Sequence, residues 1–177
     1  MPIQSGFVSI PSVTSTIREA PGHQLPVQVA AICYRLSNSS IEFLLVNTSA
    51  GKWTFPKGRM EPTLSASEAA AREALEEAGA TGSIEESYFD CYLDTKKMID
   101  GAAGVREIMI AAFLLEVGRT TPPEETHRNP TWFAPAEAKE RLAERRSTKY
   151  HGEFARVIDR AVKRVSTKKQ AFRRASV

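Results

Sequence analysis

The chain has 177 residues, of which 42% are hydrophobic and 25% are charged, and its formal net charge is +3. A chain of this size can bury one substantial core without dividing into domains. Its longest apolar run, at residues 108–115, is far shorter than the roughly 20 residues that cross a bilayer, and the first residues show no secretory signal. We therefore expect one soluble domain that is neither a membrane protein nor a secreted one.

The pattern along the chain predicts an α/β order. Residues 1–24 are polar and punctuated by proline and glycine, which is typical of an extended or partly disordered segment. Apolar runs bounded by turn residues predict strands, and apolar residues at helical spacing predict helices. The expected strands are 27–35, 41–47, 53–55, 87–93, 107–117 and 131–133, the expected exposed turns include 96–97 and 101–104, and the expected later helices are 136–144 and 151–165.

Clear signals bound a helix in the first half of the chain. Ser65 and Glu68 form an S-x-x-E capping box, and Gly79 stands where a left-handed helix end favours glycine. The sequence therefore predicts a helix between Ser65 and Gly79.

Three glutamates share one face of this helix. Because an α-helix advances about 100° per residue, Glu73, Glu76 and Glu77 lie close together. Such a face is either a solvated surface or a cation site, and carboxylate oxygens suit Mg²⁺ or Mn²⁺, which bring phosphate-bearing substrates. The opposite face, which we expect to pack, carries Ala71, Leu75 and Ala78.

The segment before the helix is suited to phosphate. A strand-like run ends at Pro56 and Gly58. Gly58 permits close approach of the backbone, and the flanking Lys57 and Arg59 can meet phosphate oxygens. This context favours a site over a solvated acidic surface.

From Gly58 to Ala80 the chain reads GRMEPTLSASEAAAREALEEAGA, which resembles the Nudix box, G-x5-E-x7-R-E-U-x-E-E-x-G-U, where U is aliphatic. Six of the seven fixed-identity positions match, and the mismatch is Leu64, where the family has glutamate. The resemblance implies an α/β fold of the Nudix type, an α/β/α sandwich with a mixed sheet between helices. It covers a domain at residues 25–165, with a basic tail at 166–177.

The resemblance also implies roles for individual residues. Glu73 and Glu77 would coordinate the metal, which is Mg²⁺ with Mn²⁺ as the alternative, and Glu76 would be a further ligand or the base that activates water. The main-chain carbonyl of Lys57 would join the metal ligands, and Arg72 would hold the carboxylates in place. A glutamate at position 64 is one of the usual polar neighbours of this arginine, so the mismatch affects the support of the site more than its ligands.

Within the superfamily the chain resembles the diphosphoinositol polyphosphate phosphohydrolases and their diadenosine polyphosphate-cleaving relatives. The shared segments are AAICYR at 30–35, GRMEP at 58–62, WF at 132–133 before AEA at 136–138, and YH at 150–151. This implies a Mg²⁺-dependent hydrolase of phosphoanhydride bonds in a phosphorylated small molecule. Because residues 27–29 lack the basic side chains of the inositol group, a dinucleoside polyphosphate carries equal weight. The alternative is a weakly catalytic or non-catalytic Nudix domain that binds a phosphorylated ligand or RNA.

Two more residues join the expected site by the same resemblance. Arg106, just ahead of the long apolar strand, aligns approximately with an arginine that meets phosphate in the relatives, and its alternative is a surface arginine. Glu125 lies in the region where some diadenosine tetraphosphate hydrolases keep an extra carboxylate.

The end of the chain is strongly basic, since seven lysines and arginines follow from Arg160 onward without one acidic residue. Such a segment could bind RNA, acidic lipids or a polyanionic substrate. No aromatic platform or RNA-binding motif accompanies it in the sequence, so we expect a frayed, solubilising terminus. Cys33 and Cys91 fall in apolar runs and indicate buried thiols in a reducing, cytoplasmic compartment. The oligomeric state is not indicated.

Overall fold

The computed structural model describes residues 28–38, 40–97 and 104–175. The expected N-terminal extension at 1–24 and most of the expected turn at 101–104 lie outside these residues. The strands are β1 (Gln28–Ser37), β2 (Ser40–Asn47), β3 (Trp53–Thr54), β4 (Lys57–Arg59), β5 (Ala80–Ile84), β6 (Asp90–Lys97), β7 (Val105–Thr120) and β8 (Thr131–Phe133). The helices are α1 (Ala66–Ala78), α2 (Pro135–Ala143) and α3 (Thr148–Ala175), with a 3-10 turn η1 (Thr126–Arg128).

A mixed sheet forms the centre of the molecule. Its main path runs β3-β2-β1-β7-β5, and β4, β6 and β8 pair with β1, β7 and β2. The central pair, β1 and β7, is parallel, whereas the other pairs are antiparallel. Because β4 is antiparallel to the start of β1, with Gly58 opposite Val29, the loop that precedes α1 is held at the sheet.

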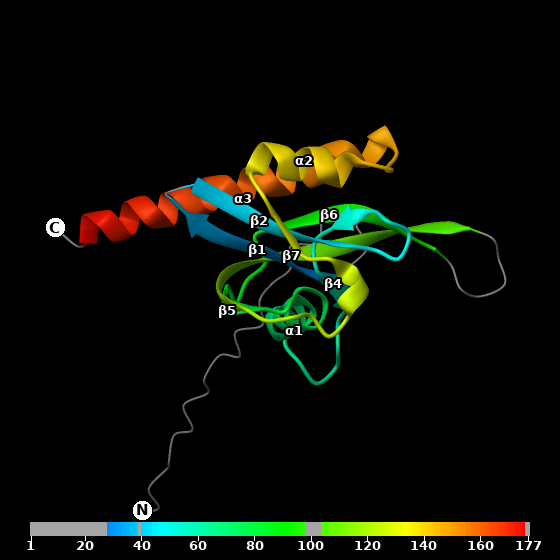
Figure 1. The fold of residues 1–177 in the computed structure, drawn as a ribbon, viewed down its shortest axis with the longest axis horizontal. Coiled ribbons are helices and arrows are strands. Elements are labelled where there is room, and N and C mark those ends of the chain that lie inside the picture. The colour runs from blue at the N-terminus through cyan, green and yellow to red at the C-terminus, as the bar shows by residue number, and fades with distance from the viewer. Residues whose placement is uncertain (1–27, 39, 98–103, 176–177) are drawn as a thin grey trace, which may run out of the picture.

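Helices cover both faces of the sheet (Figure 1). α1 lies on one face, and α2 and α3 lie together on the other. Side chains of β1 point alternately to the two faces of the sheet. Ala30 and Ile32 pack with α2 and α3, whereas Val29, Ala31 and Cys33 pack with α1. The expected α/β/α sandwich with a mixed sheet is confirmed.

Several strands depart from the expected boundaries. Lys96 and Lys97 belong to β6 rather than to a turn, because Lys96 pairs with Arg106 and Lys97 with Val105 across the β6–β7 ribbon. β4 and β5 were not expected as strands, and β5, the polar segment ATGSI, forms through antiparallel pairing with the end of β7. The strand at 131–133 matches its prediction.

The last helix is longer than predicted, since α3 runs from Thr148 to Ala175, three residues before and ten residues beyond the expected range of 151–165. The expectation of a frayed basic terminus was therefore wrong. The added residues contain no proline or glycine and are rich in lysine, arginine, glutamine and alanine, which favour helix. Among the described residues, no helix is long and apolar enough to cross a membrane.

The two cysteines differ in their surroundings. Cys33 lies in the core, where burial raises the pKa of its thiol to about 12. Cys91 is half-buried, and burial raises its pKa as well. Both thiols are free, as the sequence predicts, but Cys91 is not fully enclosed.

Candidate active site

Both predicted caps of α1 are present. The backbone N–H of Glu68 donates to the Ser65 hydroxyl at 3.3 Å, and the N–H of Ser65 donates to the Glu68 carboxylate at 2.8 Å. At the other end Gly79 adopts φ 63°, in the left-handed region that favours glycine. The helix therefore begins and ends where the sequence predicts, and this sets the direction of its glutamates.

The packing face of α1 differs from the predicted one. Ala70, Ala74 and Ala78 are almost fully buried against the sheet, whereas Leu75 is 38% exposed. These small side chains let the helix lie close to the strands. Because the helix is rotated in this way, Glu77 enters the buried side and is only 4% exposed.

Glu77 is held by groups from two other segments. The backbone N–H of Lys57 donates to its Oε2 at 3.1 Å, and the Arg128 guanidinium forms an ion pair with its Oε1. Burial raises the pKa of Glu77 to about 7, although Arg128 and the Lys57 N–H favour the charged form. Arg128 was not among the predicted site residues, because its place beside Glu77 depends on a contact across 51 residues.

Glu73 lies directly against Gly58. A Cβ atom on Gly58 would fall 1.6 Å from Glu73 Oε1, so the missing side chain makes the space that the carboxylate occupies. The pKa of Glu73 is raised, first by burial and then by the neighbouring charges of Glu76 and Glu125. Gly58, which lies in β4, therefore leaves the space for a candidate metal ligand.

Arg72 connects two carboxylates on the exposed side of α1. Its Nε donates to Glu76 Oε1 at 2.6 Å, and its Nη1 donates to Glu61 Oε2 at 3.0 Å. Leu64 instead packs against the hydrophobic cluster under α1. Glu61 thus supplies a carboxylate partner for Arg72, and position 64 supplies packing. The sequence signal for Glu61 was its place in the same loop, three residues before the mismatch.

Glu125 is the fourth glutamate of this region. Its backbone N–H donates to the Glu76 carbonyl at 3.1 Å, which fixes the loop before η1 against α1. Its carboxylate accepts from Arg128 Nε at 2.5 Å. The structure therefore brings Glu125 together with Glu73, Glu76 and Glu77.

The cations beside Gly58 point in different directions. The Lys57 ammonium lies on the sheet face covered by α2 and α3, 3.9 Å from Asp94 Oδ2, and burial lowers its pKa while Asp94 opposes this. Asp94 also lies 3.6 Å from the nearly buried Arg146. Arg59 is exposed and lies opposite Gln28 in the β1–β4 register.

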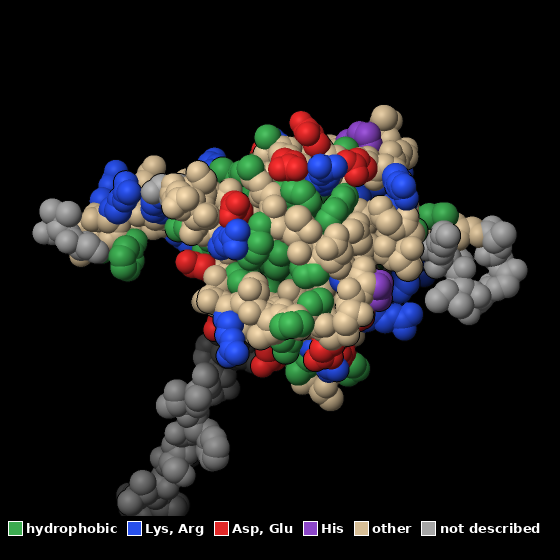
Figure 2. Space-filling model, viewed as in Figure 1, with side chains coloured by type: hydrophobic (Ala, Val, Ile, Leu, Met, Phe, Trp, Pro, Cys, Tyr) green, Lys and Arg blue, Asp and Glu red, His purple; other side chains and the backbone are tan. Residues whose placement is uncertain are grey.

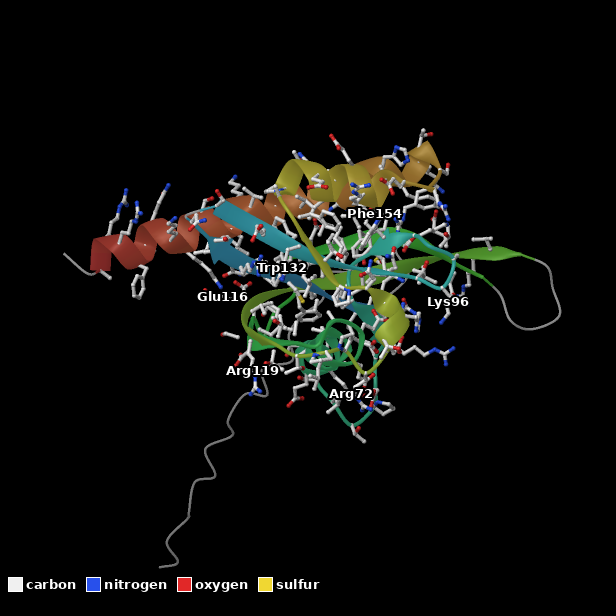
Figure 3. The ribbon with its side chains drawn as sticks, in the orientation of Figure 1. Arg72, Lys96, Glu116, Arg119, Trp132 and Phe154 are labelled. Carbon is white, nitrogen blue, oxygen red and sulfur yellow. The ribbon has the colours of Figure 1, made fainter. Side chains whose placement is uncertain are left out.

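Arg106 occupies another part of the molecule from the α1 glutamates. It lies opposite Lys96 on the β6–β7 ribbon. Figure 3 shows Lys96 on this ribbon and Arg72 on α1, in separate parts of the molecule. Of the predicted phosphate contacts, Arg59 adjoins the glutamates through Gly58, and Arg106 lies on the ribbon.

The four glutamates have the chemistry of a metal site but are held by arginines in this structure. Among the described residues, no three or more His, Cys, Asp or Glu side chains are grouped so that they could hold a metal ion. Arg72 engages Glu76, and Arg128 engages Glu77 and Glu125. Nevertheless the donors are the hard oxygens that Mg²⁺ and Mn²⁺ prefer. Burial and the repulsion from Glu76 and Glu125 raise the pKa of Glu73, and a cation would relieve the repulsion. The residue types fit such an ion.

Comparisons with known proteins agree with this fold. A family model described as NUDIX domain matches residues 26–153. An Ap4A hydrolase of C. elegans, solved as a binary complex, superposes with a TM-score of 0.58 at 21% identity, covering 79% of this chain and 97% of the other. The NUDIX domain of Shewanella oneidensis NrtR, solved with ADP ribose, superposes with a TM-score of 0.56 at 16% identity, covering 84% of this chain and 94% of the other. A NUDIX hydrolase of Nitrosomonas europaea superposes with a TM-score of 0.51 at 23% identity, covering 72% of this chain and 84% of the other.

Proposed function

This chain belongs to the NUDIX domain family and is a Nudix hydrolase of pyrophosphate bonds, and from that premise we propose that it cleaves dinucleoside polyphosphates with Mg²⁺ or Mn²⁺. The observation that carries the proposal is the position of the Glu73 carboxylate against Gly58, with Glu76 and Glu125 near enough to act on its charge and with Glu77 bonded to the backbone N–H of Lys57. Phosphoanhydrides are strongly anionic, so a site for them needs cations that the glutamates can hold.

We assign the metal to Glu73 and Glu77 with the carbonyl of Lys57, and Glu125 is a further carboxylate within reach of the same region. When bound, Mg²⁺ or Mn²⁺ neutralises phosphate charge and lowers the pKa of a water molecule. Rotation of the Glu77 and Glu125 carboxylates away from Arg128 would free them as ligands. The guanidinium would then remain beside the site as a cation for phosphate oxygens.

We propose that Glu76 is the base that accepts a proton from the attacking water. Its carboxylate is partly exposed, and the bond from Arg72 holds one oxygen while the second remains for proton transfer. Arg72 is a positioning residue in this scheme. Its second bond, to Glu61, keeps the guanidinium beside α1 in the absence of a glutamate at position 64.

The substrate assignment rests on three parts of the molecule, which are the cation beside Gly58, the β6–β7 ribbon and the start of β1. Arg59, beside Gly58, and Arg106 on the ribbon are the proposed phosphate contacts. The first strand begins with Gln28, which is 8% exposed, and β1 therefore offers no cation there for a highly phosphorylated ring. Similarity of fold to the C. elegans Ap4A hydrolase and the placement of Glu125 favour the dinucleoside substrate, and diphosphoinositol polyphosphates are the second choice.

Product analysis tests this function. We expect diadenosine tetraphosphate to be hydrolysed faster than diphosphoinositol polyphosphates, ADP-ribose, nucleoside triphosphates and capped RNA in Mg²⁺, with products resolved by chromatography. Glu76→Gln should lower kcat by about 100-fold or more, because a positioned base contributes that much. Glu77→Gln should lower kcat as well, because it removes a proposed metal ligand. Glu86→Gln, at an exposed glutamate outside the site, is the matched control.

Two results would contradict the proposal. Equal and negligible turnover of every compound would remove the substrate assignment. Tight binding of a phosphorylated ligand without metal or product would instead support a binding domain.

A further inference from the structure

We propose that the C-terminal half of α3, together with the β5–β6 loop, binds single-stranded nucleic acid at a surface separate from the four glutamates. We call this surface the α3 surface, and it consists of two adjoining grooves that share Lys168. The proposal goes beyond phosphoanhydride hydrolysis.

The α3 surface carries a concentrated positive charge. Figure 2 shows lysine and arginine side chains gathered along the end of α3 that projects beyond the sheet. Val165 is the last residue of the helix that is buried in the core, and the following ten residues extend the helix by about 15 Å. The cations of the helix from residue 160 onward are Arg160, Lys163, Arg164, Lys168, Lys169, Arg173 and Arg174.

The first groove combines cations with an aromatic ring from a distant segment. It has a volume of about 440 Å³ and lies between α3 and Phe89, which belongs to the β5–β6 loop. Every charged side chain that lines it is a cation. The lining residues are Phe89, Arg160, Lys163, Arg164, Thr167 and Lys168.

Two acids beneath this groove orient the cations without cancelling them. Arg160 Nη1 donates to Asp90 Oδ1 at 2.8 Å, and Asp90 also pairs with Arg156. Arg164 Nε donates to Glu85 Oε2 at 2.6 Å, and Glu85 also pairs with Lys168. Each acid is shared by two cations, so positive charge remains in excess. Since a guanidinium has five N–H donors, these bonds leave donors for phosphate oxygens.

The second groove repeats the combination of charge and aromatic surface. It has a volume of about 490 Å³, and Phe172 on its wall is 77% exposed. Tyr34 also lines it and donates its hydroxyl to Glu116 at 3.0 Å. The cations that line it are Lys168, Lys169 and Arg173. The two grooves together therefore offer phenyl rings flanked by lysines and arginines.

This arrangement fits single-stranded nucleic acid better than other polyanions. Proteins bind single strands through basic grooves that follow the backbone and aromatic rings on which bases stack. A helix that binds a lipid surface needs a continuous apolar face, whereas the apolar stripe of α3 is used by the core through Val157, Ile158, Ala161 and Val165. A small phosphate ligand would use one groove and leave the other aromatic ring without a role.

Fluorescence anisotropy of the full chain with a 5′-hydroxyl single-stranded RNA of about 12 nucleotides, within the length bound by single-strand modules, tests the proposal. We expect the triple variant Lys163→Gln/Lys169→Gln/Arg173→Gln to weaken binding at least tenfold. The slope of log affinity against log salt should fall by about two, since each lost phosphate contact on a single strand contributes about 0.7. The matched control removes three cations elsewhere, Lys52, Arg119 and Lys139, by the same change to glutamine. Figure 3 shows Arg119 on the α1 side of the sheet.

A second variant separates stacking from charge. Phe172→Leu keeps an apolar side chain without the ring, and we expect an affinity loss of about five- to 100-fold with an unchanged salt slope. Hydrolysis of diadenosine tetraphosphate should be unaffected by either variant, so loss of RNA binding and loss of the proposed activity are distinguishable. Equal losses in the control triple variant, or binding to phosphatidylserine vesicles but not to RNA, would overturn the proposal. An unchanged affinity of both variants would overturn it too.

Discussion

At the scale of single residues, the site depends on what one glycine leaves out. The Glu73 carboxylate occupies the position where a side chain on residue 58 would begin, 1.6 Å from the place of a Cβ atom. The atom that would have to move is the end of a flexible side chain, so the fold itself does not depend on this contact. Under the proposed function, Gly58 contributes by leaving the space that Glu73 occupies.

Gly58→Ala should reduce kcat/KM for diadenosine tetraphosphate by about 100-fold, because a displacement of about 1 Å in a reacting geometry has that effect. Thermal unfolding should change little, since Glu73 can swing aside. Steady-state kinetics at several Mg²⁺ concentrations, with a melting curve, measures both. Gly118→Ala is the control, because its Cβ would meet Thr81 only at 3.9 Å. Full activity in Gly58→Ala would show that Glu73 needs no fixed position.

At the scale of the helix, one glycine is required by its position and another is not. Gly79 ends α1 with φ 63°, and a Cβ there would fall 1.8 Å from the Thr121 carbonyl oxygen. Gly152 lies inside α3, and a Cβ there would meet nothing within 4 Å. The first glycine is required by the backbone and by its neighbour, whereas the second only weakens its helix.

Gly152→Ala should stabilise the protein by about 0.8–1 kcal/mol, because alanine favours a helix interior over glycine by that amount. In a chain of this size that corresponds to a rise in Tm of roughly 2–4 °C. Gly79→Ala should destabilise by more than about 1 kcal/mol, since it adds left-handed strain to a clash with backbone. Urea unfolding measures the change in the free energy of unfolding in both variants. A destabilised Gly152→Ala protein would contradict the placement of Gly152 in a helix interior with open space around it.

At the scale of the whole molecule, the sheet and its connections bring Gly58 and Glu125 from other parts of the chain to the three glutamates of α1. β4 brings Gly58 beside α1, and the bond from the Glu125 N–H to the Glu76 carbonyl brings the loop before η1 to the same helix. A cation that binds these carboxylates binds the folded chain and not the unfolded one. Metal binding and folding are therefore linked.

Mg²⁺ should raise the Tm of the wild-type chain relative to the same protein in EDTA. At a concentration 100 times the Kd, binding to the folded state alone contributes about 2.7 kcal/mol. The double variant Glu73→Gln/Glu77→Gln should lose the rise in Tm that Mg²⁺ causes, whatever the Tm of this variant in EDTA. The control Glu86→Gln should keep this rise. Scanning calorimetry with and without Mg²⁺ measures the difference. An equal Mg²⁺ response in the double variant would place the cation elsewhere.

Local spacing was enough to predict part of this protein. The caps of α1 and the shared face of Glu73, Glu76 and Glu77 follow from contacts within a few residues, and the strand at 131–133 follows from its own composition. The α/β/α arrangement followed from the family resemblance carried by the same box.

What the sequence by itself determined was therefore the helix, its glutamates and the family. Only the tertiary structure decided that Glu77 is buried and Leu75 exposed, because the rotation of α1 depends on how closely its alanines meet the sheet. Arg128 reaches Glu77 and Phe89 reaches the cations of α3 across dozens of residues. Such contacts form when strands pair and layers pack, and no local spacing in the chain encodes them.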